Sequence, residues 1–197
     1  MELQGLNGLS LPLTLFDGVR NDQVETLGES ISIICFNYDR CIQHYLTNAI
    51  AQTFRGVSKM QALDIVQRIN IIHPYGSLGS LKDHPFGSEA TPERIRAMSE
   101  NIVTWSESQR SDKSSKIQYA MENASTVVFL GFAFAPQNME LLTIPKTFDD
   151  PEQEVETFAT AYGYNQVIDD RLKTKILDLF SPNDFTINSN RFTFSMK

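Results

Sequence analysis

The sequence has few cysteines, no long apolar run and no excess of positive charge. Cys35 and Cys41 are the only cysteines among 197 residues, too few for paired zinc ligands or for a disulfide-rich secreted fold. We expect both to be reduced packing residues of a cytoplasmic protein. No run of about 18 apolar residues occurs, so no membrane-spanning helix is expected. No positive segment precedes an apolar block near the first residue, so no signal peptide is expected.

The charge balance argues against a nucleic-acid partner. Acidic residues outnumber basic ones by 24 to 17, and the net charge is −7. Binding to a phosphate backbone requires a basic face. Arg110, Lys113 and Lys116 lie close along the chain, but a solvated helix face explains them. We therefore expect neither a nucleic-acid nor a membrane partner.

Strand-like and helix-like patterns alternate along the chain. Apolar runs predict strands at 31–36, 69–73 and 126–132, and a weaker strand at 155–161. Apolar spacing predicts helices at 42–54, 58–68, 114–124 and 168–179, and another that starts at Thr91 and carries an apolar stripe to Trp105. Residues 106–112 form a predicted polar break. This order predicts a three-layer, Rossmann-like α/β domain with a mostly parallel sheet. We expect one domain over 1–197, with a poorly defined segment at 1–29 and a terminal strand or hairpin at 184–197.

Three of the predicted strands end in unusual tips. These are Asn37-Tyr38-Asp39, the segment 73–79 (HPYGSLG), and the segment from Gly131 to Asn138. Because parallel strands end at the same edge of a sheet, where ligands bind, the tips are expected to face one crevice.

Each tip also has a purely structural explanation. Asp39 is equally well explained as a helix N-cap, and Asn37 as a turn residue. His73 on an apolar strand is typical of a hydrogen-bonded core histidine. The glycines at 76, 79 and 131 are explained by turns or by close packing.

The three tips together resemble the sirtuin superfamily, in particular its bacterial branch of sirtuin-like domains in defence proteins. The segments are IICFNYDR, IIHPYGSLG, STVVFLGFAFAPQN and FATAYGYN, which span residues 30–165 approximately. Their order and separation carry the resemblance. It implies binding of NAD in the crevice and cleavage of the bond between nicotinamide and ribose, with water as the attacking group. The expected function is that of a sirtuin-like NAD-binding domain without a metal, which is either an NAD hydrolase of the antiviral defence type or a catalytically inactive relative.

The resemblance also implies roles for individual residues. Asn37 matches the asparagine that holds the ribose hydroxyls or the attacking water, and Asp39 matches the aspartate that receives the carboxamide of nicotinamide. The implied catalytic residues are Asn37, Asp39, His73 and Tyr75. The implied cofactor-binding residues are Phe36, Asn37, Asp39, Gly76, Ser77, Gly131 and Phe132.

The sequence departs from the family pattern at several places. Tyr75 stands where the family has its catalytic histidine, and His73 lies two residues earlier; a tyrosine is a poor base at neutral pH. Ala133 replaces a serine that touches the cofactor. The Gly-Ala-Gly loop that wraps the pyrophosphate is missing, and GLNGLS at 5–10 is the nearest segment. The chain is therefore either a shortened relative or one that has lost the phosphate site.

Three hypotheses remain open. The first is an NAD hydrolase. The second is a catalytically inactive sirtuin-like domain that senses a nucleotide or binds another protein, including a second copy or a further defence domain. The third is an ordinary parallel α/β sheet, whose three tips would not converge.

Overall fold

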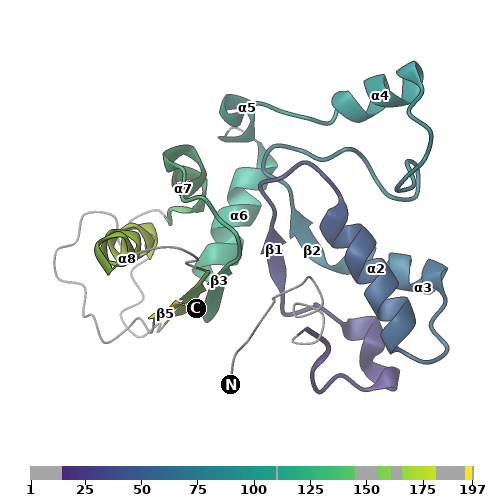
Figure 1. Cartoon of the computed structure of the whole chain (residues 1–197), viewed down its shortest axis with the longest axis horizontal. Coiled ribbons are helices and arrows are strands. Elements are labelled where there is room, and N and C mark those ends of the chain that lie inside the picture. Colours follow the sequence, from purple (N-terminus) through teal and green to yellow (C-terminus); the bar gives the residue numbers. More distant parts are fainter. Residues whose placement is uncertain (1–14, 110, 145–154, 161–165, 181–193, 197) are drawn as a thin grey trace. The chain divides into compact units, whose positions relative to one another are not determined.

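The computed structural model describes residues 15–109, 111–144, 155–160, 166–180 and 194–196 (Figure 1). The chain divides into two compact units, Met1–Thr104 and Trp105–Lys197. Both combine helices with parallel strands, so the predicted α/β class is confirmed at this level. A single domain and a three-layer Rossmann-like arrangement stay predictions.

The first unit contains a short parallel sheet with two helices packed on it. Its elements are η1 (Asn21–Thr26), β1 (Ser32–Ile34), α2 (Cys41–Thr53), α3 (Lys59–Arg68), β2 (Asn70–Ile72) and α4 (Pro92–Ser99). β1 and β2 run parallel with Ile33 opposite Ile71, and the Cys35 amide extends the ladder to the Ile72 carbonyl at 2.8 Å. The strands predicted at 31–36 and 69–73 are confirmed in their central residues.

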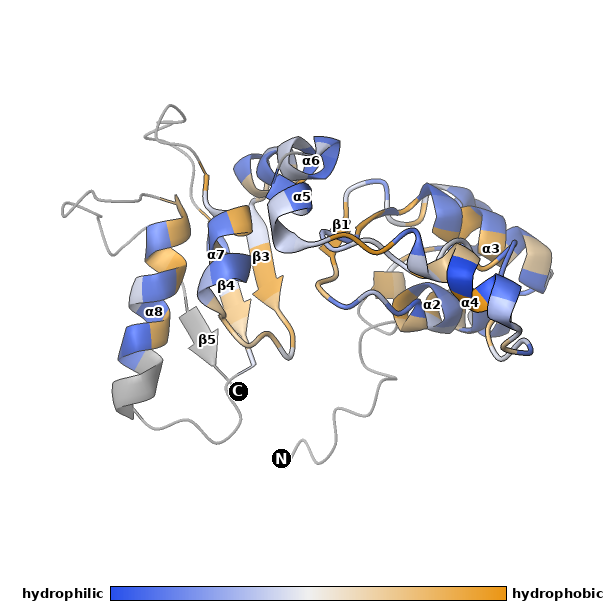
Figure 2. Cartoon of the chain, turned by 90° about the horizontal axis from the view of Figure 1, so that it is seen from above, coloured by the Kyte–Doolittle hydropathy of each residue, from blue (hydrophilic) through white to orange (hydrophobic). Residues whose placement is uncertain are grey.

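Apolar packing places α2 and α3 over one face of this sheet. Leu46 and Ile50 of α2 and Ile65 of α3 are almost fully buried in one core, and the side chains of Ile33 and Ile71 pack against it. The alternation of apolar and polar residues along both helices, visible in Figure 2, is what the sequence predicts for helices that bury one side.

The helix starts follow the capping residues of the sequence. The hydroxyl of Ser58 accepts a hydrogen bond from the amide of Gln61, whose side chain in turn accepts from the Ser58 amide at 2.9 Å. This reciprocal box satisfies two amides that helix geometry leaves without partners. Thr91 caps α4 by accepting from the Arg94 amide at 3.3 Å, with Pro92 at the first helical position.

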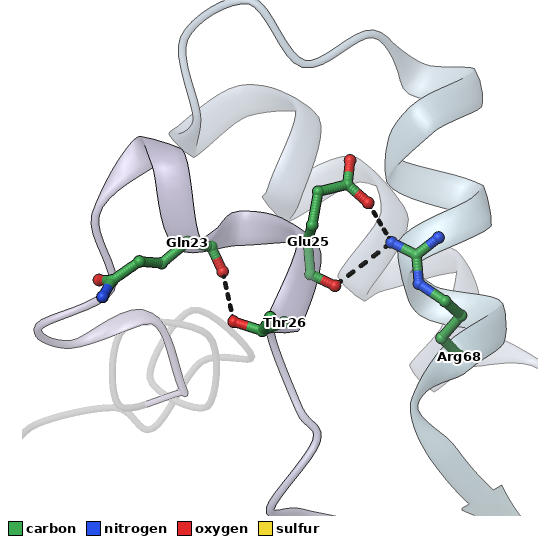
Figure 3. A network of polar contacts seen from close by, with 4 residues as sticks. All are labelled: Gln23, Glu25, Thr26 and Arg68. Atoms are coloured by element: carbon green, nitrogen blue, oxygen red, sulfur yellow. Dashed lines mark hydrogen bonds and ion pairs between the residues drawn. The ribbon is translucent and has the colours of Figure 1, made fainter.

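The region predicted to be poorly defined, 1–29, contains structure from residue 15 onward. Val24 and Leu27 are buried in the core of the first unit. Arg68, in the last turn of α3, connects this helix to η1 (Figure 3). Its guanidinium donates to the carbonyl oxygen of Glu25 at 3.3 Å and pairs with the Glu25 carboxylate. Residues 1–14, including GLNGLS, lie outside the described residues.

The predicted helix from Thr91 to Trp105 is wrong in its second half. α4 ends at Ser99, and Ile95 is 54% exposed, so the expected apolar stripe is not buried. The chain leaves the helix because Ile102 forms an antiparallel bridge with Gly76. This long-range pairing competes with helical spacing and is not visible in the local sequence.

The second unit has its own parallel sheet. Its elements are α5 (Trp105–Gln109), α6 (Asp112–Glu122), β3 (Thr126–Phe129), α7 (Pro136–Leu142), β4 (Glu156–Ala159), α8 (Gln166–Phe180) and β5 (Phe194–Met196). The strands lie in the order β3-β4-β5 and are all parallel. α5 falls in the predicted polar break, and α7 was not predicted. β5 lies in the predicted terminal strand, while residues 181–193 lie outside the description.

Candidate functional site

The predicted site residues fall into the two units. Those that follow β1 and β2 lie in the first unit: Phe36, Asn37, Asp39, His73, Tyr75, Gly76 and Ser77. Gly131 and Phe132 follow β3 in the second unit. The first two tips can therefore be described together, and the third is described separately.

His73 joins the first two tips. Its Nδ1 lies 2.7 Å from the carbonyl oxygen of Asn37, and its Nε2 lies 2.6 Å from Nε2 of Gln43. A carbonyl oxygen can only accept, so Nδ1 carries the proton, and Nε2 accepts from the Gln43 amide. The His73 side chain is buried, with 8% of its surface exposed. The strand ends do meet, and the ring that joins them has both nitrogens engaged, as in a hydrogen-bonded core histidine.

The main-chain carbonyl of Asn37 makes the hydrogen bond to His73, and the Asn37 side chain is exposed. Within the described part of the chain, its carboxamide has no hydrogen-bond partner. A carboxamide both donates and accepts, so it can orient a sugar hydroxyl and a water molecule. Asn37 is thus the member of the predicted set whose functional group is available to a ligand.

Asp39 lies one residue before Arg40, which is the N-cap residue of α2. Its Oδ1 accepts a hydrogen bond from the Cys41 amide at 2.9 Å. The same carboxylate raises the pKa of the Cys41 thiol, chiefly through a side-chain hydrogen bond. The N-cap of α2 is thus Arg40 and not Asp39, although Asp39 does bond the first amide of the helix. Its implied contact with a carboxamide stays a prediction.

Tyr75 and Gly76 are held by packing. The ring of Tyr75 meets that of Phe36 edge to face, with centroids 6.1 Å apart, and burial raises the pKa of Tyr75. A tyrosine with a raised pKa is neutral at pH 7 and is no general base. Gly76 has φ of +80°, and a Cβ placed there would lie 1.8 Å from the carbonyl oxygen of Asn101. Glycine is required at this position by steric contact, independently of any cofactor.

A cavity of about 340 Å³ lies beside these tips, on the face of β2 that α2 and α3 cover. Its lining includes His73 and Ser77 from the predicted set, and Arg40 and Gln43, which the sequence reasoning missed. Arg40 occupies the position before α2 and Gln43 lies in the first turn of that helix. The signal that could have found them is their position: the first turn of a helix that follows directly on a buried parallel strand.

Arg40 is a buried cation, with 6% of its surface exposed. Its Nη1 donates to the carbonyl oxygens of Ser80, at 3.1 Å, and of His84. Among the ion pairs of the described residues, none includes Arg40, and burial lowers the pKa of its guanidinium. Arg40 therefore holds the loop after β2 in place, beside the cavity that it helps to line.

The third tip is organised by aromatic packing. Phe132 lies 5.6 Å from Phe129 and 4.9 Å from Phe134, measured between ring centroids. The Gly131 amide donates to the hydroxyl of Thr160 at 2.9 Å. Ala133 is exposed. The positive φ of Gly131, +57°, and the ring contacts of Phe132 explain these two residues structurally, and their implied role toward a cofactor stays a prediction.

The described part of the chain contains no candidate metal cluster and no candidate membrane span. In that part of the chain, no three His, Cys, Asp or Glu side chains gather closely enough to hold a metal ion. None of the described helices is both long enough and apolar enough to cross a membrane. Comparisons with models of protein families, with curated proteins and with solved structures found no match to this chain.

Proposed function

We propose that the chain is a sirtuin-like domain that binds NAD or a related nucleotide at the carboxyl ends of β1 and β2. The observation that carries the proposal is the contact of the two tips through His73 and Asn37, 2.7 Å apart. It makes a shared strand-end edge of the kind at which parallel sheets bind ligands, and the exposed carboxamide of Asn37 lies there. The resemblance of the sequence segments to sirtuin-like domains suggests NAD as the nucleotide.

The finer description of the fold belongs to the same proposal. A three-layer Rossmann-like domain with one mostly parallel sheet is supported by the parallel direction of all described strand pairs. Val128 and Leu130, on and just after β3, are exposed apolar side chains. Such side chains are typical of a strand that another layer covers.

Binding without cleavage is the form of the function that the site supports best. His73 has both ring nitrogens in structural hydrogen bonds, the Asp39 carboxylate bonds the Cys41 amide, and the raised pKa of Tyr75 keeps it neutral. None of these three is arranged as a general base. A nucleotide-sensing or protein-binding domain follows. Antiviral defence and a further partner domain or second copy are expectations that go with the resemblance, and a cytoplasmic location is the expectation from the two cysteines.

Hydrolysis of NAD is the second candidate, and Asn37 favours it. A departing nicotinamide is a good leaving group, so positioning of the ribose and a water supplies much of the catalysis. The exposed carboxamide of Asn37 has the donor and the acceptor for that task.

Calorimetry of the full chain with NAD and with ADP-ribose tests the proposal. We expect heat of binding from the unaltered chain, and a loss of affinity of about tenfold or more in Asn37→Ala, because one hydrogen-bonding side chain is removed. Asn123→Ala, an exposed asparagine of the second unit, should bind as the unaltered chain does. Absence of heat with both nucleotides would overturn the proposal.

The same samples separate the two candidates by chromatography. Nicotinamide release no greater than in Asn37→Ala supports a sensor. Release that Asn37→Ala abolishes supports the hydrolase.

A further inference from the structure

The cavity beside the first two strand tips combines apolar walls with one fixed charge. Its volume, about 340 Å³, lies within the range of small-molecule sites, which are mostly apolar with a few polar groups. Arg40 is the only lysine, arginine or acid among the described residues that line it. The apolar side chains of the wall come from α3, β2 and the loop after β2: Leu63, Val66, Ile71 and Leu81.

Arg40 is buried without a counterion. Only 6% of its surface is exposed, and no ion pair of the described residues includes it. Asp83, an acid of the loop that Arg40 holds, accepts instead from the Ser80 hydroxyl at 2.7 Å. Arginine is almost never fully buried unless it is paired, because an isolated buried charge loses its solvation by water. The carbonyl oxygens of Ser80 and His84 offset part of this loss, but they carry no full negative charge.

The guanidinium has one nitrogen left for a ligand. Nε is sealed from solvent, so no ligand can reach it, and Nη1 is occupied by two carbonyl oxygens. Nη2 bonds no described residue, and it is not among the buried, unpartnered atoms. Ser77 supplies a second group, because it lines the same cavity and its hydroxyl makes no hydrogen bond to the described residues. The cavity thus offers one charged donor and one hydroxyl.

We infer that this cavity binds a small monocarboxylate with a hydrocarbon body. The carboxylate accepts a hydrogen bond from Nη2 of Arg40 and another from the Ser77 hydroxyl. The hydrocarbon body packs against Leu63, Val66 and Leu81. A hydrogen bond between ionised partners is about twice as strong as one between neutral groups, and this one gives the buried cation its missing counterion.

A monocarboxylate matches the charge of this cavity better than a phosphate or a neutral group does. One cation balances one negative charge, whereas a phosphate monoester brings nearly two negative charges into an apolar space. The fork of two guanidinium nitrogens that favours phosphate is not available, since Nε and Nη1 of Arg40 are not free. A neutral amide or alcohol of the same shape would leave the cation without a counterion.

This inference goes beyond the proposed function and does not depend on nucleotide binding. NAD and ADP-ribose carry no carboxylate, so the two classes of ligand are tested separately. Binding of hexanoate by a chain that ignores both nucleotides would keep the inference and overturn only the proposed function. Binding of a nucleotide by a chain that ignores hexanoate would overturn only the inference.

Hexanoate is the probe, and three related compounds separate its parts. Hexanamide has the same shape without the charge, acetate has the charge without the hydrocarbon, and hexyl phosphate replaces the carboxylate by a phosphate. Calorimetry of the full chain, or a titration followed by nuclear magnetic resonance, should show saturable binding of hexanoate. We expect its affinity to exceed that of each other compound by about tenfold or more.

The other outcomes of this comparison each overturn the inference. The first is the absence of saturable hexanoate binding. Equal affinity for hexanamide would show an apolar cavity only, and equal affinity for acetate would show an anion site that does not recognise hydrocarbon. Tighter binding of hexyl phosphate would show a phosphate site.

A variant of Arg40 tests the assigned cation. Arg40→Met keeps much of the side-chain length and removes the charge, so hexanoate affinity should fall by about tenfold or more while that of hexanamide changes little. Arg55→Met removes an exposed arginine just after α2 and should have no effect. Unchanged hexanoate affinity in Arg40→Met, or equal losses for both compounds, would overturn the assignment to the charge.

A second variant tests the cavity while the cation stays in place. Leu81→Trp fills the space beside Arg40, so hexanoate binding should be lost. Met60→Trp adds the same side chain at an exposed position of α3 and should bind hexanoate as the unaltered chain does. This pair keeps the inference testable if Arg40→Met fails to fold, and unchanged hexanoate binding in Leu81→Trp would overturn it.

Discussion

His73 and Asn37 connect the ends of two adjacent parallel strands through one bond from a ring nitrogen to a main-chain oxygen. The bond spans 36 residues of sequence and lies in a buried environment. Its main-chain partner makes it independent of the asparagine side chain. The link should therefore matter for stability whatever ligand the unit binds.

His73→Phe should lower the free energy of unfolding by about 2 kcal/mol, because the Gln43 amide loses its acceptor and the Asn37 carbonyl keeps only the weak thiol donor of Cys35. Urea denaturation measures the change. His44→Phe is the matched control: His44 stacks on Phe86 at 4.3 Å, an aromatic contact that phenylalanine preserves, so a smaller loss is expected. Equal stability of His73→Phe and the unaltered chain would contradict the structural role.

Gly76→Ala should be strongly destabilising, by about 3 kcal/mol or more, since both backbone strain and a clash with main-chain atoms oppose it. Gly56→Ala separates these effects. Gly56 also has a positive φ, +84°, but a Cβ there meets nothing within 4 Å. That control should cost only about 1 kcal/mol from strain. Thermal or urea unfolding that gives the two variants equal losses would show that the contact with Asn101 is unimportant.

Arg40→Ala should free the loop that its guanidinium holds through two carbonyls. Lys82 is exposed in this loop, so trypsin should cut after it several-fold faster than in the unaltered chain. Arg55→Ala, an exposed arginine after α2, serves as the control and should leave the rate unchanged. Mass spectrometry of the early fragments identifies the cleaved bond, and an unchanged rate at Lys82 would argue against the tether.

Asp39→Asn should speed alkylation of Cys41 near pH 7.5. The Asp39 carboxylate raises the pKa of this thiol, first through a hydrogen bond, so removing its charge lowers the pKa and increases the reactive thiolate at neutral pH. The gain should disappear at a pH well above the ordinary thiol value of 9.0, where both forms are ionised. Asparagine keeps an oxygen that can accept from the Cys41 amide.

Cys35 provides an internal comparison for the alkylation experiment. Its pKa is raised mainly by burial and only secondarily by charge. Iodoacetamide labelling followed by peptide mapping should therefore show a larger change at Cys41 than at Cys35. A uniform increase at both thiols would indicate general loosening of the fold.

The sequence was a good guide where local chemistry decides the structure. Ser58 and Thr91 marked helix starts because a capping hydroxyl acts within three residues. The parallel strands around Ile33 and Ile71 followed from continuous apolar runs. α7 was missed because seven residues give too short an apolar pattern.

Contacts between distant segments could not be predicted in the same way. The bridge from Gly76 to Ile102 ended the predicted helix early, and it depends on residues 26 positions apart. Arg40 and Gln43 bond residues that are 30 or more positions away, in the loop after β2 and at His73. Asn37 was identified from a resemblance, and its exposure within the tip required coordinates.

The bridge between Gly76 and Ile102 has a practical consequence for the segment between them. Together with the hydrogen bond from the Val103 amide to the Tyr75 carbonyl oxygen, 3.0 Å long, this bridge holds the two ends of the intervening loop together. Extra residues inserted in such a loop add only a small entropic cost, and the paired residues at its two ends stay in place. A small fluorescent or affinity tag inserted after the exposed Gly87 should therefore report on ligands at the strand ends while the sheet beneath stays intact.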